Sequence, residues 1–402
     1  MAALACILYD QHKEVTGSDI SKYIFTQDTL EERGILITTF DESNIKDNDT
    51  VIIGLAFDES NVEVKAALNN PTVKTYRYNE YLGVLLQSFD SICVAGTHGK
   101  STTTGLLGTV LSKDDSTAYL IGDGHGAMPE GAKYFVLESC EFKRHFLAYS
   151  PDYAIVTNIE LDHVDYYKDM DDYVLAFQQF VNQVKKKVVV FGAAHYLTKL
   201  NYTIPHVTYG LNDGNDYQAI HVEQGPFGME FDILHKHEII SHVSLREVGD
   251  PFLQDALGTF ALAHELGMDC ALIVEGLQAY KGIARRFVIE EVKDSVLVDD
   301  YAHHPTAIQY MIDSVRKKYP DKKVVALYKP DRYSRLQEFL ERFAQSMNTA
   351  DQVCLCDFPK NAVREDETIT VTIQDMIDLR PGSIPLDIDE ASAQILSKMA
   401  PA

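Results

Sequence analysis

The segment "ICVAGTHGKSTTT", residues 92–104, joins a short apolar run to a cluster of glycine, lysine and hydroxyl residues. Gly96 and Gly99 can adopt positive φ angles and let the backbone approach a ligand closely. Lys100 can reach phosphate oxygens, and the following "STTTGLLGTVL" predicts a helix whose N-terminal N–H groups face an anion. The segment therefore predicts a buried strand, a phosphate-binding loop and a helix, in that order.

The hydroxyl of Ser101 or Thr102 could hold Mg²⁺ beside such a phosphate. A general P-loop has a further glycine five residues before the glycine of the GK pair, where this chain has Val94. The loop is therefore the shorter G-x-x-G-K-S form. The alternative is a glycine turn that only caps a helix.

Short β-branched runs alternate with amphipathic stretches along much of the chain. Buried strands are predicted at residues 50–57, 91–96, 133–139, 152–158, 186–192, 295–302, 323–328 and 352–357. Alternation of strands and helices is typical of α/β proteins with parallel sheets covered on both faces. Since ligands bind beyond the carboxyl ends of such strands, we expect the functional residues directly after them.

The 402 residues favour two or three domains. We divide them at 1–89, a small α/β unit; 90–284, with the phosphate loop, the largest sheet and a polar β-rich patch; and 285–402, a third α/β unit. The net charge of −24 argues against binding to nucleic acid or anionic membranes. Scattered cysteines indicate buried thiols in a reducing compartment, and no apolar run suggests a membrane span or a secretory signal. We therefore expect a cytoplasmic protein, either a monomer or a dimer.

Polar residues follow several of the predicted strands. Glu138 ends the strand "YFVLE", where a carboxylate would suit Mg²⁺ or form a surface ion pair. His163 lies in "TNIELDHVD" after the next strand, and a lone loop histidine is more often only solvated. The third unit offers "VLVDDYAHHPTAI" and "KPDRYSR", whose arginines suit carboxylate or phosphate groups.

Several of these motifs together resemble one family. "GTHGKSTTTGLL" resembles the ATP loop of the Mur ligases, which are ATP-dependent amino-acid ligases of peptidoglycan synthesis. "MAALACILYDQHKEVTGSD", "ESCEFKRHFLAYSPDYAIVTNIELDHVDYY", "GIARRF", "VDDYAHHPTAI" and "KPDRYSR" resemble the branch that joins L-alanine to UDP-N-acetylmuramate. The resemblance covers most of the chain in the family's order.

The resemblance implies three domains: a Rossmann-like N-terminal domain for the UDP substrate, a central P-loop ATPase-like domain for ATP, and a Rossmann-like C-terminal domain for the amino acid. It also implies roles for individual residues. The residues implied to bind the nucleotide are Gly96, Thr97, His98, Gly99, Lys100, Ser101, Thr102, Arg286 and Asp300. The catalytic residues would be Lys100, Glu138 and His163, and the magnesium ligands would be Ser101, Glu138 and His163. The residues implied to bind the substrates are Asp19, His303, His304, Arg332 and Arg335.

The implied reaction begins with transfer of the ATP γ-phosphoryl group to the lactyl carboxylate of UDP-N-acetylmuramate. The amine of L-alanine then attacks the acyl phosphate and releases phosphate. Closure of the third domain would exclude water from that intermediate.

Two features depart from the family's pattern. Met1 falls where the family has the methionine after its first strand and glycine-rich turn, so that strand and turn are not among these residues. Pro251, Phe252 and Asp255 replace a His and two Asn that the family places near the ATP base and ribose, and Pro and Phe cannot supply the same hydrogen bonds. These departures leave open a nucleotide-binding pseudoenzyme of the same fold. A Mur-type ligase for another amino acid or peptide is a further alternative, because acceptor specificity depends on a few contacts in the third domain. A generic P-loop kinase does not account for the third-domain motifs.

Overall fold

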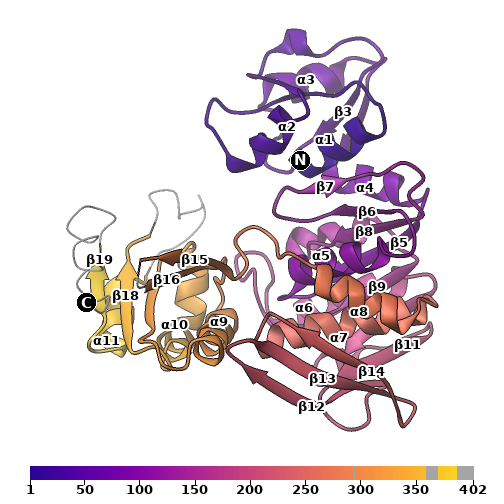
Figure 1. Ribbon diagram of the computed structural model, residues 1–402. Helices are drawn as coiled ribbons and strands as arrows, with labels where there is room; N and C mark the ends of the chain where they lie inside the picture. The colour runs from indigo at the N-terminus through magenta and orange to yellow at the C-terminus, as the bar shows by residue number, and fades with distance from the viewer. Residues whose placement is uncertain (294, 359–369, 387–402) are drawn as a thin grey trace.

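The computed structural model describes residues 1–293, 295–358 and 370–386. Figure 1 shows an N-terminal unit at one end of a large central sheet and a C-terminal unit beside that sheet. The third domain predicted from the sequence extends to residue 402, and 359–369 and 387–402 of it lie outside the described residues.

Ten strands of the described residues form one sheet in the order β14-β13-β12-β11-β10-β9-β5-β8-β6-β7. These strands are β5 (Asp90–Ala95), β6 (Thr117–Leu120), β7 (Gly126–Ala127), β8 (Tyr134–Glu138), β9 (Tyr153–Val156), β10 (Lys187–Phe191), β11 (His206–Gly210), β12 (Tyr217–Gly225), β13 (Gly228–His235) and β14 (Glu238–Leu245). Pairing is parallel from β6 across to β12 and antiparallel at both ends. The predicted α/β class with a large parallel sheet is confirmed, and the polar β-rich patch is its antiparallel extension.

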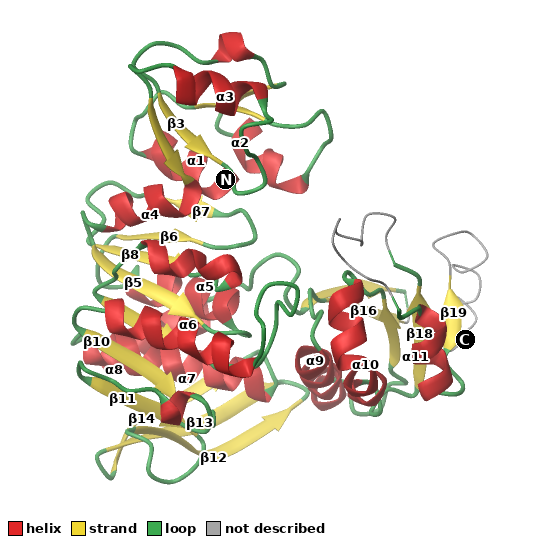
Figure 2. Ribbon diagram, turned by 180° about the vertical axis from the view of Figure 1, so that it is seen from behind, coloured by secondary structure: helices red, strands yellow, loops and turns green. Residues whose placement is uncertain are grey.

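Helices cover both faces of this sheet (Figure 2). Along β5, Ile92 and Val94 belong to the core that the sheet shares with α5 (Lys100–Leu111), α7 (Asp250–Glu265) and α8 (Cys270–Ala279). Cys93 and Ala95 point to the opposite core, which contains α1 (Ala2–Asp10), α4 (Tyr78–Leu86) and α6 (Met170–Gln183). Because side chains alternate between the two faces, a strand buried on both sides is a continuous apolar run, as "ICVA" at residues 92–95 is.

The N-terminal unit contains two small parallel sheets, β1–β2 and β3–β4. Its further elements are β1 (Thr16–Ser18), α2 (Asp28–Glu31), β2 (Leu36–Thr38), β3 (Thr50–Ile53), α3 (Val62–Asn69) and β4 (Lys74–Arg77). Short 3-10 helices lie at Phe25–Gln27 and Glu42–Asn44, and two more lie in the central unit at Phe142–Ala148 and Leu197–Lys199. Leu4 and Ile7 of α1 are buried in the same core as Leu120 and Met128, so α1 attaches this unit to the central sheet.

The C-terminal unit has a parallel sheet in the order β17-β18-β19. Its elements are β15 (Val288–Val292), β16 (Ser295–Asp299), α9 (Pro305–Lys318), β17 (Val325–Tyr328), α10 (Tyr333–Ser346), β18 (Gln352–Cys356), α11 (Ile373–Leu379) and β19 (Ile384–Leu386). The prediction that β16 is a buried strand was wrong. It pairs with β15 as an antiparallel ribbon, and its side chains are exposed or half-buried.

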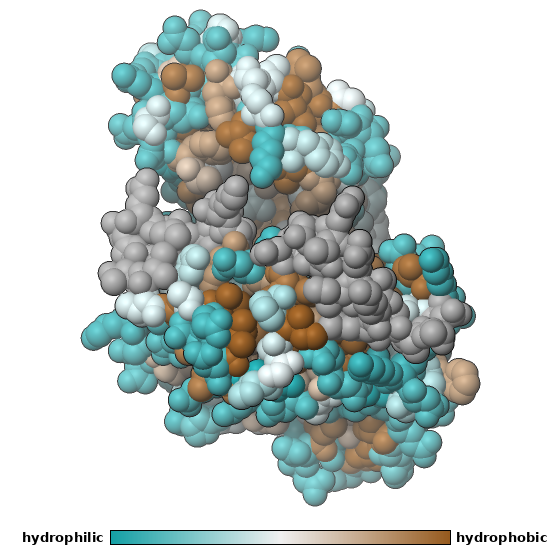
Figure 3. All heavy atoms as spheres, turned by 90° about the vertical axis from the view of Figure 1, so that its left-hand side faces the viewer, coloured by the Kyte–Doolittle hydropathy of each residue, from teal (hydrophilic) through white to brown (hydrophobic). Residues whose placement is uncertain are grey.

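The surface fits the acidic composition. On the face shown in Figure 3, hydrophobic residues gather in small patches between hydrophilic ones. No helix of the described residues is both long and apolar enough to cross a membrane. No disulfide joins the six cysteines, and Cys140 is exposed, contrary to the expectation of buried thiols throughout.

Candidate active site

The loop between β5 and α5 has the predicted strand–loop–helix geometry. Gly96 has φ 141° and Gly99, the N-cap residue of α5, has φ 82°. A Cβ atom on Gly96 would lie 2.0 Å from Thr157 Oγ1, and one on Gly99 would lie 2.4 Å from Asp255 Oδ1. Both positions therefore require glycine for backbone conformation and for space. The first turn of α5 presents its backbone N–H groups at this loop, as a phosphate site requires.

Lys100 folds back over the loop that precedes it. Its Nζ donates hydrogen bonds to the carbonyl oxygens of Gly96 (2.6 Å) and Thr97 (3.1 Å) and lies 3.0 Å from Glu141 Oε2. His163 Nε2 lies 3.5 Å from the other oxygen of Glu141, which is only 2 % exposed. Burial alone would raise the pKa of Glu141, but Lys100 and His163 hold it below its usual range. The pKa of Lys100 is raised in turn, because the attraction of Glu141 outweighs the opposing effect of burial.

Glu141 was not among the residues predicted from the sequence. Glu138, which was predicted, ends β8 and accepts hydrogen bonds from Ser101 Oγ (3.0 Å) and from the backbone N–H of Gly122 (2.6 Å). Both carboxylates belong to "ESCE" directly after the strand. The rule that placed function at the strand ends covered the second glutamate equally well.

Ser101 and Glu138 form one hydrogen-bonded pair beside the phosphate loop, and Glu141 and His163 form a second pair beside Lys100. Hydroxyl and carboxylate oxygens are the ligands that Mg²⁺ prefers, so both pairs offer suitable donor atoms. His163 has a backbone φ of 52°, and its backbone N–H donates a hydrogen bond to Asp162 Oδ1 at 2.7 Å. The structure thus pairs Ser101 with Glu138, and it pairs His163 with Glu141, which the sequence analysis did not predict.

The remaining loop residues are positioned by the segment after β9. Thr97 Oγ1 donates to the carbonyl oxygen of Glu160 at 2.8 Å, and the backbone N–H of His98 donates to Asn158 Oδ1 at 2.9 Å. The side chain of Thr102 is half-buried in the first turn of α5. The loop after β9 therefore holds the phosphate loop in shape.

Arg335 joins the C-terminal unit to the central unit. Its Nε lies 2.9 Å from Asp162 Oδ1, and its Nη1 lies 2.8 Å from Asp331 Oδ1. Asp162 is buried, and Arg335 and His163 keep its pKa well below the usual range against the effect of burial. The guanidinium predicted to bind substrate is therefore already engaged by two carboxylates. The side chain of Arg332, the N-cap residue of α10, makes no hydrogen bond or ion pair with the residues that the structure describes.

The two adjacent histidines differ in position. His304 is 0 % exposed and caps α9, accepting a long hydrogen bond from the backbone N–H of Thr306 (3.4 Å). His303 is partly exposed, with Nδ1 2.8 Å from the carbonyl oxygen of Tyr301 and Nε2 3.9 Å from Asp162 Oδ2. Of the pair, only His303 is accessible to a substrate in this arrangement.

Arg286 and Asp300 lie at the joint between the units. Asp300 accepts hydrogen bonds from the backbone N–H groups of Phe287 (2.8 Å) and Ala302 (2.7 Å), so its carboxylate shapes the joint. The guanidinium of Arg286 lies 5.4 Å from the ring centre of Tyr301. Asp19, at the end of β1 in the N-terminal unit, accepts from the backbone N–H of Ile20 at 2.8 Å. The contacts of Asp19 are thus within its own unit, and none of them is to the phosphate loop.

The N-terminus of α7 carries the departures noted in the sequence. Pro251 is in the first turn, and the ring of Phe252 stacks on Tyr280 with centroids 6.0 Å apart. Asp255 is 6 % exposed and accepts a hydrogen bond from Thr103 Oγ1 at 3.0 Å. Burial raises the pKa of Asp255 to about 8, although the Thr103 hydrogen bond and Arg286 oppose this. A neutral carboxyl group therefore lies against the phosphate loop on this side.

Comparison with known families agrees with the fold. Residues 1–90 match the model of the Mur ligase family, catalytic domain; residues 94–263 match the Mur ligase middle domain; and residues 285–401 match the Mur ligase, glutamate ligase domain. The chain belongs to the Mur ligase family. Mur ligases are ATP-dependent, and this chain is a ligase of peptidoglycan synthesis.

Individual relatives show which Mur ligases this chain is similar to. The chain is 44 % identical over 378 residues to the UDP-N-acetylmuramate–L-alanine ligase of Pediococcus pentosaceus, covering 94 % of this chain and 86 % of the relative. The crystal structure of the UDP-N-acetylmuramate-alanine ligase MurC from Thermotoga maritima has the same fold, with a TM-score of 0.81 at 24 % identity, covering 100 % of this chain and 90 % of that one. The MurF ligase of Thermotoga maritima, solved in complex with ADP, gives 0.68 at 18 % identity over 90 % of each chain.

Proposed function

We propose that this chain joins L-alanine to the lactyl carboxylate of UDP-N-acetylmuramate through an acyl phosphate, with ATP as the phosphoryl donor. The ligase of Pediococcus pentosaceus, 44 % identical, supports the choice of substrates. The observation that carries the proposal is the cluster of Lys100, Glu141 and His163 at the phosphate loop. We also propose the cytoplasm, where ATP is available, as the compartment.

Phosphoryl transfer requires neutralisation of the charge on the phosphoryl oxygens. Lys100 supplies a cation directly at the glycine loop, and Glu141 orients it through the 3.0 Å ion pair. Ser101, Glu138, Glu141 and His163 would hold Mg²⁺, which when bound supplies further positive charge. When a nucleotide enters, Lys100 would exchange its carbonyl contacts with Gly96 and Thr97 for phosphate oxygens.

The C-terminal unit would supply the amino-acid site and exclude water from the acyl phosphate. Arg332 offers a guanidinium group for a carboxylate at the start of α10, and His303 adds a partly exposed imidazole near Asp162. The buried Asp162–Arg335 pair holds this unit against the loop that carries His163. The proposed roles of the three segments follow: 1–89 for the UDP substrate, 90–284 for ATP and 285–402 for the amino acid.

Phosphate release tests the proposal. The purified chain should release phosphate only when ATP, Mg²⁺, UDP-N-acetylmuramate and L-alanine are all present. Release that does not depend on L-alanine would contradict the proposal, and replacing L-alanine by other amino acids or by peptides would identify a different Mur-type ligase.

A nucleotide-binding pseudoenzyme is the second candidate, and the α7 N-terminus favours it. Phe252 is stacked on Tyr280, and Asp255 is hydrogen-bonded to Thr103. Neither side chain therefore offers the ATP base or ribose an amide hydrogen-bond donor. Calorimetric titration with ATP, with and without Mg²⁺, separates the two candidates when combined with the turnover assay. Mg²⁺-dependent binding without phosphate release under any substrate combination would favour the pseudoenzyme.

A further inference from the structure

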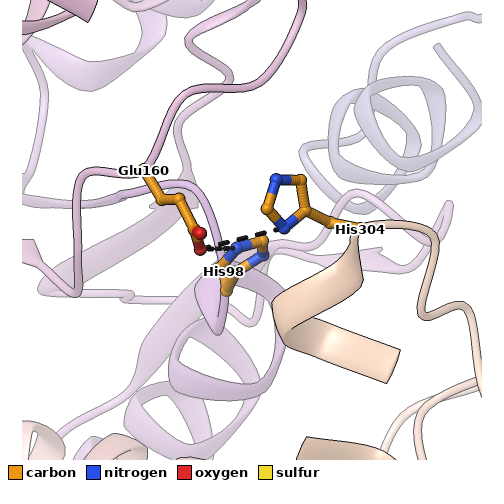
Figure 4. Close-up of side chains that lie close together, drawn as sticks. All are labelled: His98, Glu160 and His304. Atoms are coloured by element: carbon orange, nitrogen blue, oxygen red, sulfur yellow. Dashed lines mark hydrogen bonds and ion pairs between the residues drawn. The ribbon is translucent and has the colours of Figure 1, made fainter. Parts of the chain in front are cut away.

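Three side chains from distant segments converge between the central and C-terminal units (Figure 4). His98 belongs to the phosphate loop, Glu160 to the loop after β9, and His304 to the start of α9. Glu160 Oε2 lies 3.0 Å from His98 Nε2 and 3.8 Å from His304 Nδ1. One donor atom from each residue lies within 4.8 Å of the other two. Within the described residues, this is the one group of three or more such side chains with metal-binding spacing.

The protonation states suit a metal ion. Burial and the neighbouring His98 lower the pKa of His304 to about 3, so its imidazole is neutral at physiological pH. Its Nδ1 receives only the 3.4 Å contact from the backbone of Thr306, which is longer than an ordinary hydrogen bond. The pKa of Glu160 lies well below its usual range, because hydrogen bonds and the charges around it outweigh burial. The group therefore offers an ionised carboxylate and a lone pair on a neutral imidazole.

The two oxygens of Glu160 have different partners. Oε1 accepts hydrogen bonds from Thr306 Oγ1 (2.8 Å) and from Arg342. Arg342 also donates to Thr306 Oγ1 at 2.9 Å. Oε2 is left facing the two histidine rings. Hydrogen bonds that fix one oxygen of a carboxylate and leave the other for an ion are typical of the surroundings of protein metal sites.

We propose that His98, Glu160 and His304 form a binding site for Zn²⁺ or a similar transition-metal ion, separate from the proposed magnesium site, with water as the remaining ligand. Two imidazoles and one carboxylate with an open fourth position are a donor set that Zn²⁺ uses. Bonds of about 2.0–2.2 Å at tetrahedral angles place donor atoms about 3.4 Å apart. Binding would therefore move the His98 and Glu160 donor atoms slightly apart and bring the His304 donor atom closer to them. The ion would tie the phosphate loop to α9. This inference does not depend on which amino acid the ligase uses.

Metal binding itself tests the inference. A chelator first removes bound metal from the chain. Excess Mg²⁺ is then added to fill the proposed magnesium site, and the chain is titrated with Co²⁺ as the only transition metal. We expect one Co²⁺ per chain, with the visible absorption of a four- or five-coordinate ion, and its displacement by Zn²⁺. Absence of that absorption would overturn the proposal. Loss of the absorption in Cys140→Ser would also overturn it, because Cys140 would then be a ligand of the ion.

Substitutions locate the ion. His98→Gln and Glu160→Gln alter side chains that are partly exposed, and each should raise the dissociation constant for Zn²⁺ at least about tenfold. His303→Gln is the matched control, since it changes the histidine adjacent to His304 but outside the group, and His163→Gln removes a proposed magnesium ligand. Unchanged Zn²⁺ affinity in His98→Gln and Glu160→Gln, or an affinity lost only in His163→Gln, would assign the ion elsewhere and reject the site.

Discussion

Two buried carboxylates flank the same phosphate loop and have opposite pKa shifts. Glu141 lies beside Lys100 and His163, and its pKa is lowered in spite of burial. Among the residues that the structure describes, the carboxyl group of Asp255 has only the hydroxyl of Thr103 as a hydrogen-bond partner, and burial raises its pKa to about 8. The comparison shows that burial by itself does not set the charge of an acid, since a cation in contact reverses the result. The surroundings of Glu141 on one side of the loop favour the ionised carboxylate, and those of Asp255 on the other side favour the neutral acid.

Removing the positive charge of Lys100 should have the largest effect on the difference between Glu141 and Asp255. Lys100→Met takes away the charge that stabilises the transferred phosphoryl group and leaves Glu141 buried without its main partner. We expect phosphate release to fall by about 10³-fold or more. Lys113→Met is the matched control, because Lys113 follows the C-terminal end of α5 and pairs with the exposed Glu275. A similar loss in both variants would indicate a general effect of removing a lysine near α5.

Replacing each glutamate in turn sharpens the assignment of the magnesium ligands. Glu141→Gln should lower kcat by about 10²–10³-fold, because it loses the charge that faces both Lys100 and His163. Glu138→Gln keeps an amide oxygen for Ser101 and should lose less. The check is kcat and the Mg²⁺ concentration required for half-maximal rate, measured for both variants. A larger loss in Glu138→Gln would restore Glu138 as the principal carboxylate.

A third buried acid extends the comparison to the joint between the units. Asp162 is ionised because Arg335 pairs with it, so Arg335→Met would leave a buried charge without its partner. Removal of one member of such a pair costs about 3–5 kcal/mol. The measurement is the free energy of unfolding of the C-terminal unit in urea. Arg316→Met, which breaks a more exposed ion pair with Asp351, should cost much less.

Asp255→Asn should leave turnover largely unchanged and should alter stability in a way that depends on pH. The raised pKa means that the folded chain holds this proton more tightly than the unfolded chain does, so the wild type loses stability as pH rises towards about 8. Tyr209, Tyr280 and Arg286 also face this carboxyl, and only Arg286 favours its ionised form. Asparagine does not titrate, so the stability of the variant relative to wild type should improve by up to about 1.4 kcal/mol per pH unit between about pH 5 and 8. Unfolding curves that keep a constant separation over this range would contradict the assigned protonation state.

The sequence predicted which loops form the candidate active site better than it predicted which individual residues meet there. Strand–helix alternation and the rule for strand ends led to Gly96, Lys100 and the loop of His163, all of which the structure brings together. The choice of Glu138 over Glu141 could not be made from spacing, because the chain turns after β8 and only this turn directs Glu141 at Lys100. The β16 strand was misjudged for a related reason, since an apolar run does not reveal which strand will pair with it.

The order of apolar runs, glycines and charged loops in the sequence determined the α/β class, the phosphate loop and the family, because these depend on local pattern and on short-range conformational preference. The tertiary structure decided which charges meet. Residues as distant as Asp162 and Arg335, or His98 and His304, come together only when the C-terminal unit packs against the central sheet. Their protonation depends on burial and on neighbours within a few ångströms, and those contacts exist only after the chain has folded.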